Sequence, residues 1–209
     1  TYGSMTLVSG TDYDLSYGAN VNAGAASVTI TGKGNYTGTN TVSFTIDKKA
    51  LTDSMISLDK TSFVYDGSDK SVTATVADGT ALKSSDYDFS SDTVTTAKNV
   101  GTYTVKAVAK ATGNYSGSCS ATWEITPGTI TASVTFADDF TYDATYHDLV
   151  TISDKVPSDA TVTYTVNGST VSSVSVKDAG TYSIKVTISA TGYGTETYED
   201  SVTISKAVA

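Results

Sequence analysis

The sequence predicts an all-β protein built as a tandem array of small two-layer units, and three observations lead to this prediction. Residues 31–46 (TGKGNYTGTNTVSFTI) return at 111–125 (ATGNYSGSCSATWEI) and, more loosely, at 190–204 (ATGYGTETYEDSVTI). Thr, Ser, Val, Tyr and Gly dominate the composition, with only 2 Pro, which is typical of strands separated by turns. Apolar residues alternate with polar ones in short runs, which indicates strands that bury one face.

The repeat has a fixed period. In every copy a loop glycine precedes the closing isoleucine at the same spacing, and successive isoleucines are themselves equally spaced, as Ile46, Ile125 and Ile204 show. Such regularity marks one structural unit used repeatedly. We therefore expect a partial unit at residues 1–49 and complete units at 50–128 and 129–209. Because the junctions are short, we expect a stiff, elongated array and not units on flexible linkers.

The partial unit comes first. Val28 and Ile30 alternate with threonines, as do Val42, Phe44 and Ile46 with serine and threonine, so both runs are predicted strands. The glycine-punctuated loop at residues 32–38 is predicted to join them as a hairpin.

The two complete units follow one pattern. Each has an aromatic strand before a turn, several short strands, a long strand after a glycine, a hairpin and a closing strand. In the second unit the turn is Tyr65-Asp66-Gly67, the long strand starts in 99–105 (NVGTYTV), and Pro127-Gly128 ends the unit. The third unit repeats this order from Phe140 to Ile204.

Trp123 lies at the position of Phe44 and Val202 when the copies are aligned on their closing isoleucines. Three apolar residues at one inward position favour core packing for Trp123 and Phe44 over a platform for sugars.

Aligning Asp12-Tyr13 with Asp86-Tyr87 shows that the first unit lacks counterparts of residues 50–76, which hold the first two strands. A sandwich without an inner strand exposes its core and unpaired backbone groups. Two explanations remain open: these strands lie upstream in a longer parent, or another chain supplies them by strand addition, which would join subunits into a filament.

Charge and composition exclude several function classes. The net charge is −9 and the sequence contains no Arg, so nucleic acid and anionic membranes are poor partners. One Cys (Cys119) and one His (His147) allow neither an intrachain disulfide nor a His/Cys zinc cluster. No apolar run reaches the roughly 20 residues of a membrane helix. We expect no cofactor, no metal and no catalytic residues.

The segments Asn99-x-Gly101-x-Tyr103-x-Val105 and Asp178-x-Gly180-x-Tyr182-x-Ile184 resemble the D-x-G-x-Y-x-C segment of immunoglobulin domains, with Val and Ile in place of the cysteine. With the YDG turn and the GNYTG hairpin, the whole chain resembles the bacterial immunoglobulin-like repeats of the MBG type, found in tandem in cell-surface adhesins. The resemblance implies tandem immunoglobulin-like β-sandwiches, one partial and two complete. It gives Tyr103 and Tyr182 a structural corner role. In the first unit Ala26 stands in place of the corner tyrosine.

Tyr36 and Tyr115, at equivalent hairpin tips, are the candidate ligand contacts, expected to be exposed to a sugar or a protein. The alternative is that each tyrosine folds over its own loop glycine. Acidic pairs such as Asp12-x-Asp14 match no EF-hand loop. His147 lies near Asp143 and Asp148 without an activated nucleophile, which favours a surface histidine. Cys119 is expected to be an inert, partly buried thiol.

The sequence therefore predicts a non-catalytic stalk, spacer or fibre subunit of a bacterial extracellular or cell-surface protein. Its expected partners are neighbouring repeats or further copies, and a host glycan or surface protein is a candidate partner. The alternative is a carbohydrate- or mucin-binding adhesion module in which Tyr36 and Tyr115 contact the ligand.

Overall fold

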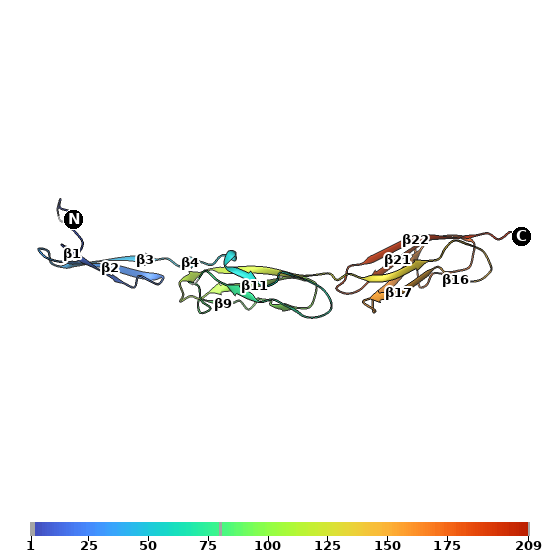
Figure 1. The fold of residues 1–209 in the computed structure, drawn as a ribbon, viewed down its shortest axis with the longest axis horizontal. Coiled ribbons are helices and arrows are strands. Elements are labelled where there is room, and N and C mark those ends of the chain that lie inside the picture. The colour runs from blue at the N-terminus through green and yellow to red at the C-terminus, as the bar shows by residue number, and fades with distance from the viewer. Residues whose placement is uncertain (1–2, 80, 209) are drawn as a thin grey trace. The chain divides into compact units, whose positions relative to one another are not determined.

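The computed structural model describes residues 3–79 and 81–208 (Figure 1). Its regular elements over these residues are β-strands, apart from a short 3₁₀ turn, η1 (Asp53–Met55). The prediction of an all-β chain is confirmed. Contacts between residues divide the chain into two compact units, whose bounds differ from those of the three sequence repeats. The first unit consists of Thr1–Thr61, Ser71–Thr96 and Tyr103–Trp123. The second unit consists of Ser62–Lys70, Ala97–Thr102 and Glu124–Ala209.

The first unit begins with an antiparallel sheet of three strands in the order β1 (Tyr13–Gly18), β2 (Gly24–Gly32), β3 (Thr39–Ile46). In its register Val28 lies opposite both Tyr17 and Val42, and Ala26 lies opposite Phe44. Since side chains alternate along a strand, one face carries the apolar set Tyr13, Leu15, Tyr17, Ala26, Val28, Ile30, Val42, Phe44 and Ile46. The other face is polar, with Asp14, Ser16, Ser27, Thr29, Thr31, Thr41, Ser43 and Thr45.

Much of this apolar face is exposed. Phe44 is 44% exposed, Val42 49% and Tyr17 65%, so the expectation that Phe44 packs in a core is wrong. The physical reason is that the described residues place no second layer over these side chains.

The strands of residues 49–126 are short, apart from β11 and β13. They include β4 (Lys49–Ala50), β5 (Ile56–Leu58), β7 (Lys70–Ser71), β8 (Ala74–Val76), β9 (Tyr87–Phe89), β10 (Thr96–Ala97), β11 (Gly101–Ala109), β12 (Tyr115–Ser116) and β13 (Ser118–Thr126). With β6 (Ser62–Val64), they form sheets in the orders β6-β13-β11-β9, β5-β8, β10-β7 and β12-β4. The buried side chains that they and their connections supply include Leu51, Ile56, Val72, Val76, Leu82, Val105, Ala107, Cys119 and Trp123.

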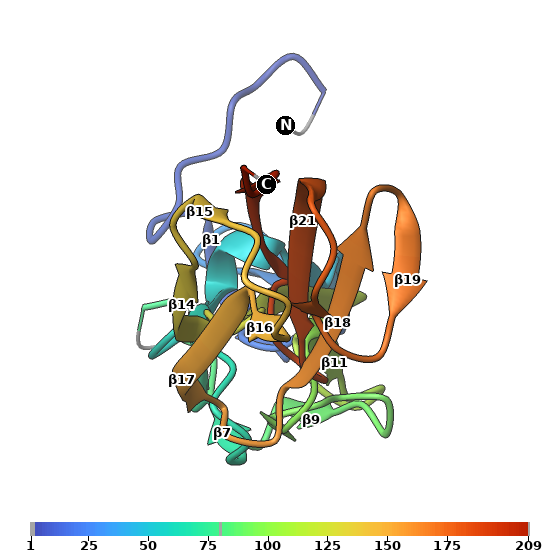
Figure 2. The same cartoon turned by 90° about the vertical axis from the view of Figure 1, so that its right-hand side faces the viewer.

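The second unit contains a two-layer β-sandwich. One layer pairs β14 (Thr131–Phe136) with β17 (Val150–Val156). The other is a sheet in the order β15 (Phe140–Thr141), β22 (Glu196–Ser205), β21 (Gly180–Ser189), β18 (Thr161–Val166), β19 (Ser169–Val171). A smaller pair joins β16 (His147–Asp148) to β20 (Ser175–Val176). Figure 2 shows β14 and β17 on one side and β21, β18 and β19 on the other.

The core of this sandwich lies between the two layers. It contains Ile130, Leu149, Ala160, Val174, Ile184, Val186, Ile188 and Val202. The inward alternation of Ile184, Val186 and Ile188 along β21 is the one that the sequence pattern predicts. The strand content and this sandwich confirm the predicted immunoglobulin-like fold class.

Candidate functional site

The two hairpin tyrosines lie in different surroundings. Tyr115 is only 5% exposed, so the expectation that it projects from a hairpin tip is wrong. It starts β12, which pairs in parallel with β4 so that Tyr115 lies opposite Lys49. The Tyr115 hydroxyl donates to Asp78 Oδ2 at 3.0 Å, and Lys49 Nζ lies 2.5 Å from the same oxygen. The backbone pairing with Lys49 and the hydrogen bond to Asp78 hold this tyrosine against the chain.

These three groups shift one another's proton affinity. The hydrogen bond from Lys49 and then that from Tyr115 hold the pKa of the Asp78 carboxyl below its usual value. Burial, followed by the hydrogen bond to Asp78, raises the pKa of Tyr115. The hydrogen bond to Asp78 also raises the pKa of Lys49. The cluster therefore keeps one carboxylate, one ammonium and one neutral phenol at neutral pH.

Tyr36 is half-buried in the hairpin that joins β2 to β3. It lines a hollow together with Leu7, Asp12, Tyr13 and Ile30. Tyr36 and Tyr115 thus belong to hairpins with different surroundings, and they do not form one shared platform.

Three of the residues predicted to be structural, Trp123, Tyr103 and Tyr182, make contacts within the fold. Trp123 is 1% exposed, and its ring lies 4.9 Å from that of Tyr103. The Trp123 Nε1 donates to the backbone oxygen of Val94 at 2.8 Å. The Tyr182 hydroxyl donates to the backbone oxygen of Asp178, four residues upstream, at 2.7 Å, which is the corner contact typical of immunoglobulin domains.

The hairpin at residues 113–117 makes a junction inside the first unit. Asn114 Oδ1 accepts from the backbone N–H of Ala23 at 2.7 Å, and its Nδ2 donates to Asn22 Oδ1 at 3.0 Å. The backbone oxygen of Asn114 accepts from the N–H of Lys49 at 2.9 Å. Sequence reasoning missed Asn114, although the recurrence of Gly-Asn-Tyr at 34–36 and 113–115 was a signal.

Two more bonds complete this junction. The N–H of Leu51 donates to the oxygen of Ser116 at 2.8 Å, and Lys48 Nζ donates to the backbone oxygen of Ala111. The residues that follow the closing strand β3 are therefore tied to the hairpin of the next sequence repeat.

A related junction lies inside the second unit. The N–H of Gly128 donates to Gly192, and that of Gly194 donates back to Gly128, both at 2.9 Å. The ring of Tyr65 packs edge-on against that of Tyr193, with centroids 5.3 Å apart. A β-carbon at Gly192 would lie 2.4 Å from Tyr65 Cε1, so only glycine allows this approach.

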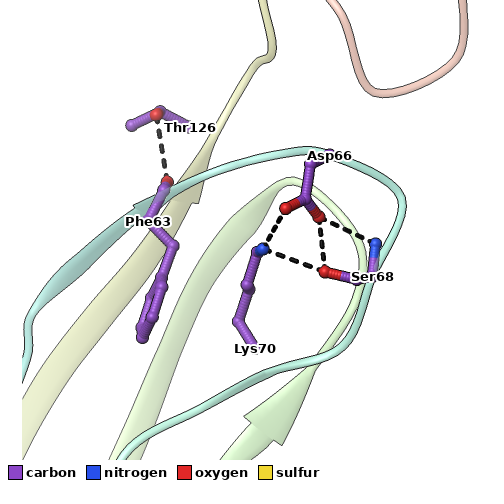
Figure 3. A network of polar contacts seen from close by, with 5 residues as sticks. All are labelled: Phe63, Asp66, Ser68, Lys70 and Thr126. Atoms are coloured by element: carbon purple, nitrogen blue, oxygen red, sulfur yellow. Dashed lines mark hydrogen bonds and ion pairs between the residues drawn. The ribbon is translucent and has the colours of Figure 1, made fainter.

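The predicted turn after Tyr65 is closed by its own side chains, as Figure 3 shows. Asp66 Oδ1 accepts from the N–H and hydroxyl of Ser68 at 2.9 and 2.5 Å, and Lys70 Nζ lies 2.5 Å from Asp66 Oδ2. This arrangement is an Asx turn. The lysine and then Ser68 hold the pKa of the Asp66 carboxyl well below its usual range.

His147 takes the place of that lysine in the third repeat. Asp143 accepts from the N–H and hydroxyl of Thr145 at 2.9 and 2.7 Å, and His147 Nε2 lies 3.0 Å from both carboxylate oxygens. The Thr145 hydroxyl and then His147 hold the pKa of Asp143 well below its usual range. This geometry makes His147 a partner that closes a turn.

We expect Asp66→Asn to lower the thermal stability of the protein at pH 7. Because the folded pKa of Asp66 is depressed, its stabilisation is fully present above the unfolded pKa of about 3.9 and is lost as pH falls through the folded pKa. The gap in Tm between the variant and wild type should therefore narrow below about pH 4. Asp69→Asn, in the same turn, is the control and should change Tm less. A gap that stays constant from pH 7 to pH 2 would contradict this role.

No described residues form a group of three or more His, Cys, Asp or Glu side chains able to hold a metal ion. In the described part of the chain, no helix is long and apolar enough to span a membrane. Cys119 is 1% exposed, and burial followed by the charge of Asp53 raises the pKa of its thiol, which disfavours the reactive thiolate.

Comparison with protein-family models finds a match to part of the chain. Residues 54–129 match the family model described as MBG domain. This segment is therefore an MBG-like module, consistent with an extracellular structural or adhesion-type module. No curated protein was found to be similar to the chain.

The similar solved structures include three at low identity. The fibronectin(III)-like modules of Clostridium thermocellum CbhA are 21% identical to this chain, with a TM-score of 0.30. The match covers 73% of this chain and 95% of the CbhA chain. Sidekick-1 immunoglobulin domains 1–5 are 11% identical, with a TM-score of 0.29, and the match covers 95% of this chain and 52% of that one. Protocadherin gamma B2 extracellular cadherin domains 1–5 are 15% identical, with a TM-score of 0.23, and the match covers 90% of this chain and 46% of that one. The chain thus spans about half the length of the last two. At these TM-scores the similarities carry no argument about this chain.

Proposed function

We propose that this chain is a non-catalytic structural module of a bacterial extracellular protein, acting as a stalk, spacer or fibre subunit in a surface adhesin or filament. One observation carries the proposal: a residue just beyond each of the first two closing strands bonds through its backbone to the next hairpin. Lys49 bonds to Asn114 and Gly128 bonds to Gly192, and the two donors occupy equivalent places in successive repeats. A protein that holds two parts at a fixed distance or transmits force needs its repeats tied together in this way.

The chemistry of the chain supports the same function. The polar clusters described above close turns and junctions, so a structural role explains each of them. The MBG match over residues 54–129 supports extracellular display, because repeats of this type resemble the building blocks of surface adhesins.

The first junction gives a direct test of the spacer function. Spin labels at Ser43 and Thr104, in a background with the buried Cys119 replaced by alanine, should give a narrow distance distribution at low protein concentration. Asn114→Ala removes two side-chain hydrogen bonds worth about 1 kcal/mol each, so open arrangements should become about tenfold or more frequent and broaden the distribution.

Asn35→Ala is the matched control for that measurement, because Asn35 holds the same place in the first hairpin. It should leave the distribution unchanged. A broad distribution in the unmodified chain would contradict a spacer, since the repeats would then move freely.

We also propose that the apolar face of the β1-β2-β3 sheet is completed by a strand from a neighbouring chain. The exposed Phe44, Val42 and Tyr17 would gain cover, and an edge strand of this sheet would gain backbone partners. Size-exclusion chromatography tests self-polymerisation through this face, which a clean monomer would rule out.

The alternative carbohydrate- or mucin-binding function has lost one of its two contacts, because Tyr115 is buried against Asp78. Tyr36, which is half-buried in its hairpin, is the remaining candidate contact. A glycan array would decide in its favour if a glycan bound and Tyr36→Ala abolished the binding.

A further inference from the structure

A hollow lies at the end of the second unit where β22 leaves the sandwich. It is lined by Tyr142, Asp178, Ala179, Lys206, Ala207 and Val208. Asp178 and residues 206–208 are exposed, and Val208 is fully so. We call these six residues the end surface.

The register of the strands shows where the end surface belongs in the repeat. Gly24 pairs with Ile46 in the first repeat as Gly180 pairs with Ile204 in the third, and Ala26 pairs with Phe44 as Tyr182 pairs with Val202. Counting from these pairs, Asn22 and Ala23 correspond to Asp178 and Ala179. Lys48 and Lys49 likewise correspond to Lys206 and Ala207.

The corresponding surface of the first repeat is occupied. The hairpin at residues 113–117 lies on it through Asn114, which bonds to Asn22, Ala23 and Lys49. Lys48 donates to the backbone oxygen of Ala111, just before this hairpin. Four groups that hold a hairpin in the first repeat thus have counterparts on the end surface.

The end surface also has the aromatic group of the second junction. The N–H of Tyr65 donates to Thr126 at 2.9 Å, and that of Tyr142 donates to Ser205 at 2.8 Å, so the two tyrosines occupy the same place beside the closing strand. Tyr65 packs against the hairpin residue Tyr193. Tyr142 is half-buried and lines the hollow.

We propose that the end surface binds the hairpin at residues 34–38 of a second copy of this chain, giving head-to-tail association. That hairpin carries Gly-Asn-Tyr at 34–36, the same residues as the seated hairpin at 113–115. Asn35, which is exposed, would donate its amide to the Asp178 carboxylate and accept from the N–H of Ala179. A carboxylate acceptor makes this bond stronger than the amide pair of the first junction.

The proposal rests on the proposed function, because it extends the tie between successive repeats to successive molecules. The interface is heterologous, so it joins the tail of one molecule to the head of the next. A single hairpin is a small contact, and we expect weak association, with a Kd of about 0.1–1 mM.

Sedimentation equilibrium with two complementary variants tests the proposal. Asn35→Ala removes the hairpin contact and keeps the end surface, whereas Asp178→Lys does the reverse. The average mass of wild type should rise between about 10 µM and 1 mM at near-physiological salt. Each variant alone should stay monomeric, and an equimolar mixture should form 1:1 dimers. Asp148→Lys, at an exposed acid of the same unit, should behave as wild type.

Two results would overturn the proposal. One is a wild type that stays monomeric up to about 1 mM. The other is association that both variants retain, which would place the contact elsewhere, such as the apolar face of the first sheet. Neither result touches the proposed spacer function, because the spin-label measurement across the first junction tests that function within single molecules. Circular dichroism of both variants confirms that they are folded.

Discussion

Replacing Trp123 with alanine should destabilise the strands around it by about 3–5 kcal/mol, the range for removing a buried large aromatic side chain. The side chain is 1% exposed, packs against Tyr103 and donates to Val94. Its loss would leave a cavity and an unpaired carbonyl oxygen together. Native-state hydrogen exchange at the amides of Val105 and Ala107 in β11 is the appropriate measurement, since several units need not unfold as one. Exchange should accelerate about 100-fold or more.

Phe44→Ala is the matched control, because Phe44 occupies the same place in the repeat. It is 44% exposed, so its removal should cost about 1 kcal/mol or less, read at the β2 amides. If Phe44→Ala cost as much as Trp123→Ala, the apolar face of the first sheet would have to be covered in solution.

The comparison of these two residues shows how far sequence reasoning reaches. The even spacing of the repeats and the alternation of apolar residues predicted the strands, the hairpins and the inward side of each strand. They assigned Phe44 and Trp123 to the same side, which the register of β2 and β3 supports for Phe44. Alternation cannot show whether a second layer covers that side, because the cover comes from residues far away in the chain.

The environment of Tyr115 was unpredictable for a similar reason. Its burial depends on the parallel pairing of β12 with β4 and on Asp78 as acceptor for its hydroxyl. Residues from two different sequence repeats make that pairing, and no local pattern encodes it. By contrast, the Tyr182 contact with Asp178 joins residues only four positions apart, so the local motif was sufficient to predict it.

Replacing Gly192 with alanine should disrupt the junction that Tyr65 makes with the hairpin around Tyr193. Gly192 has φ +81°, and a β-carbon there would lie 2.4 Å from the Tyr65 ring. The backbone strain of such a φ for alanine is about 1–2 kcal/mol, and overpacking adds about 1–3 kcal/mol. The N–H groups of Gly128 and Gly194, which hold the junction closed, should exchange about 30-fold faster or more.

Gly168→Ala separates the two contributions, because Gly168 has the same φ of +81° and nothing within 4 Å of its added β-carbon. It should therefore show the strain alone, read at the amides of its own hairpin. Tyr65→Ala combined with Gly192→Ala should recover the overpacking part, since removing the ring makes room for the new methyl group, and the two effects should be strongly non-additive. Additive effects would mean that Tyr65 does not contact Gly192 in solution, and the second junction would then rest on its backbone hydrogen bonds alone.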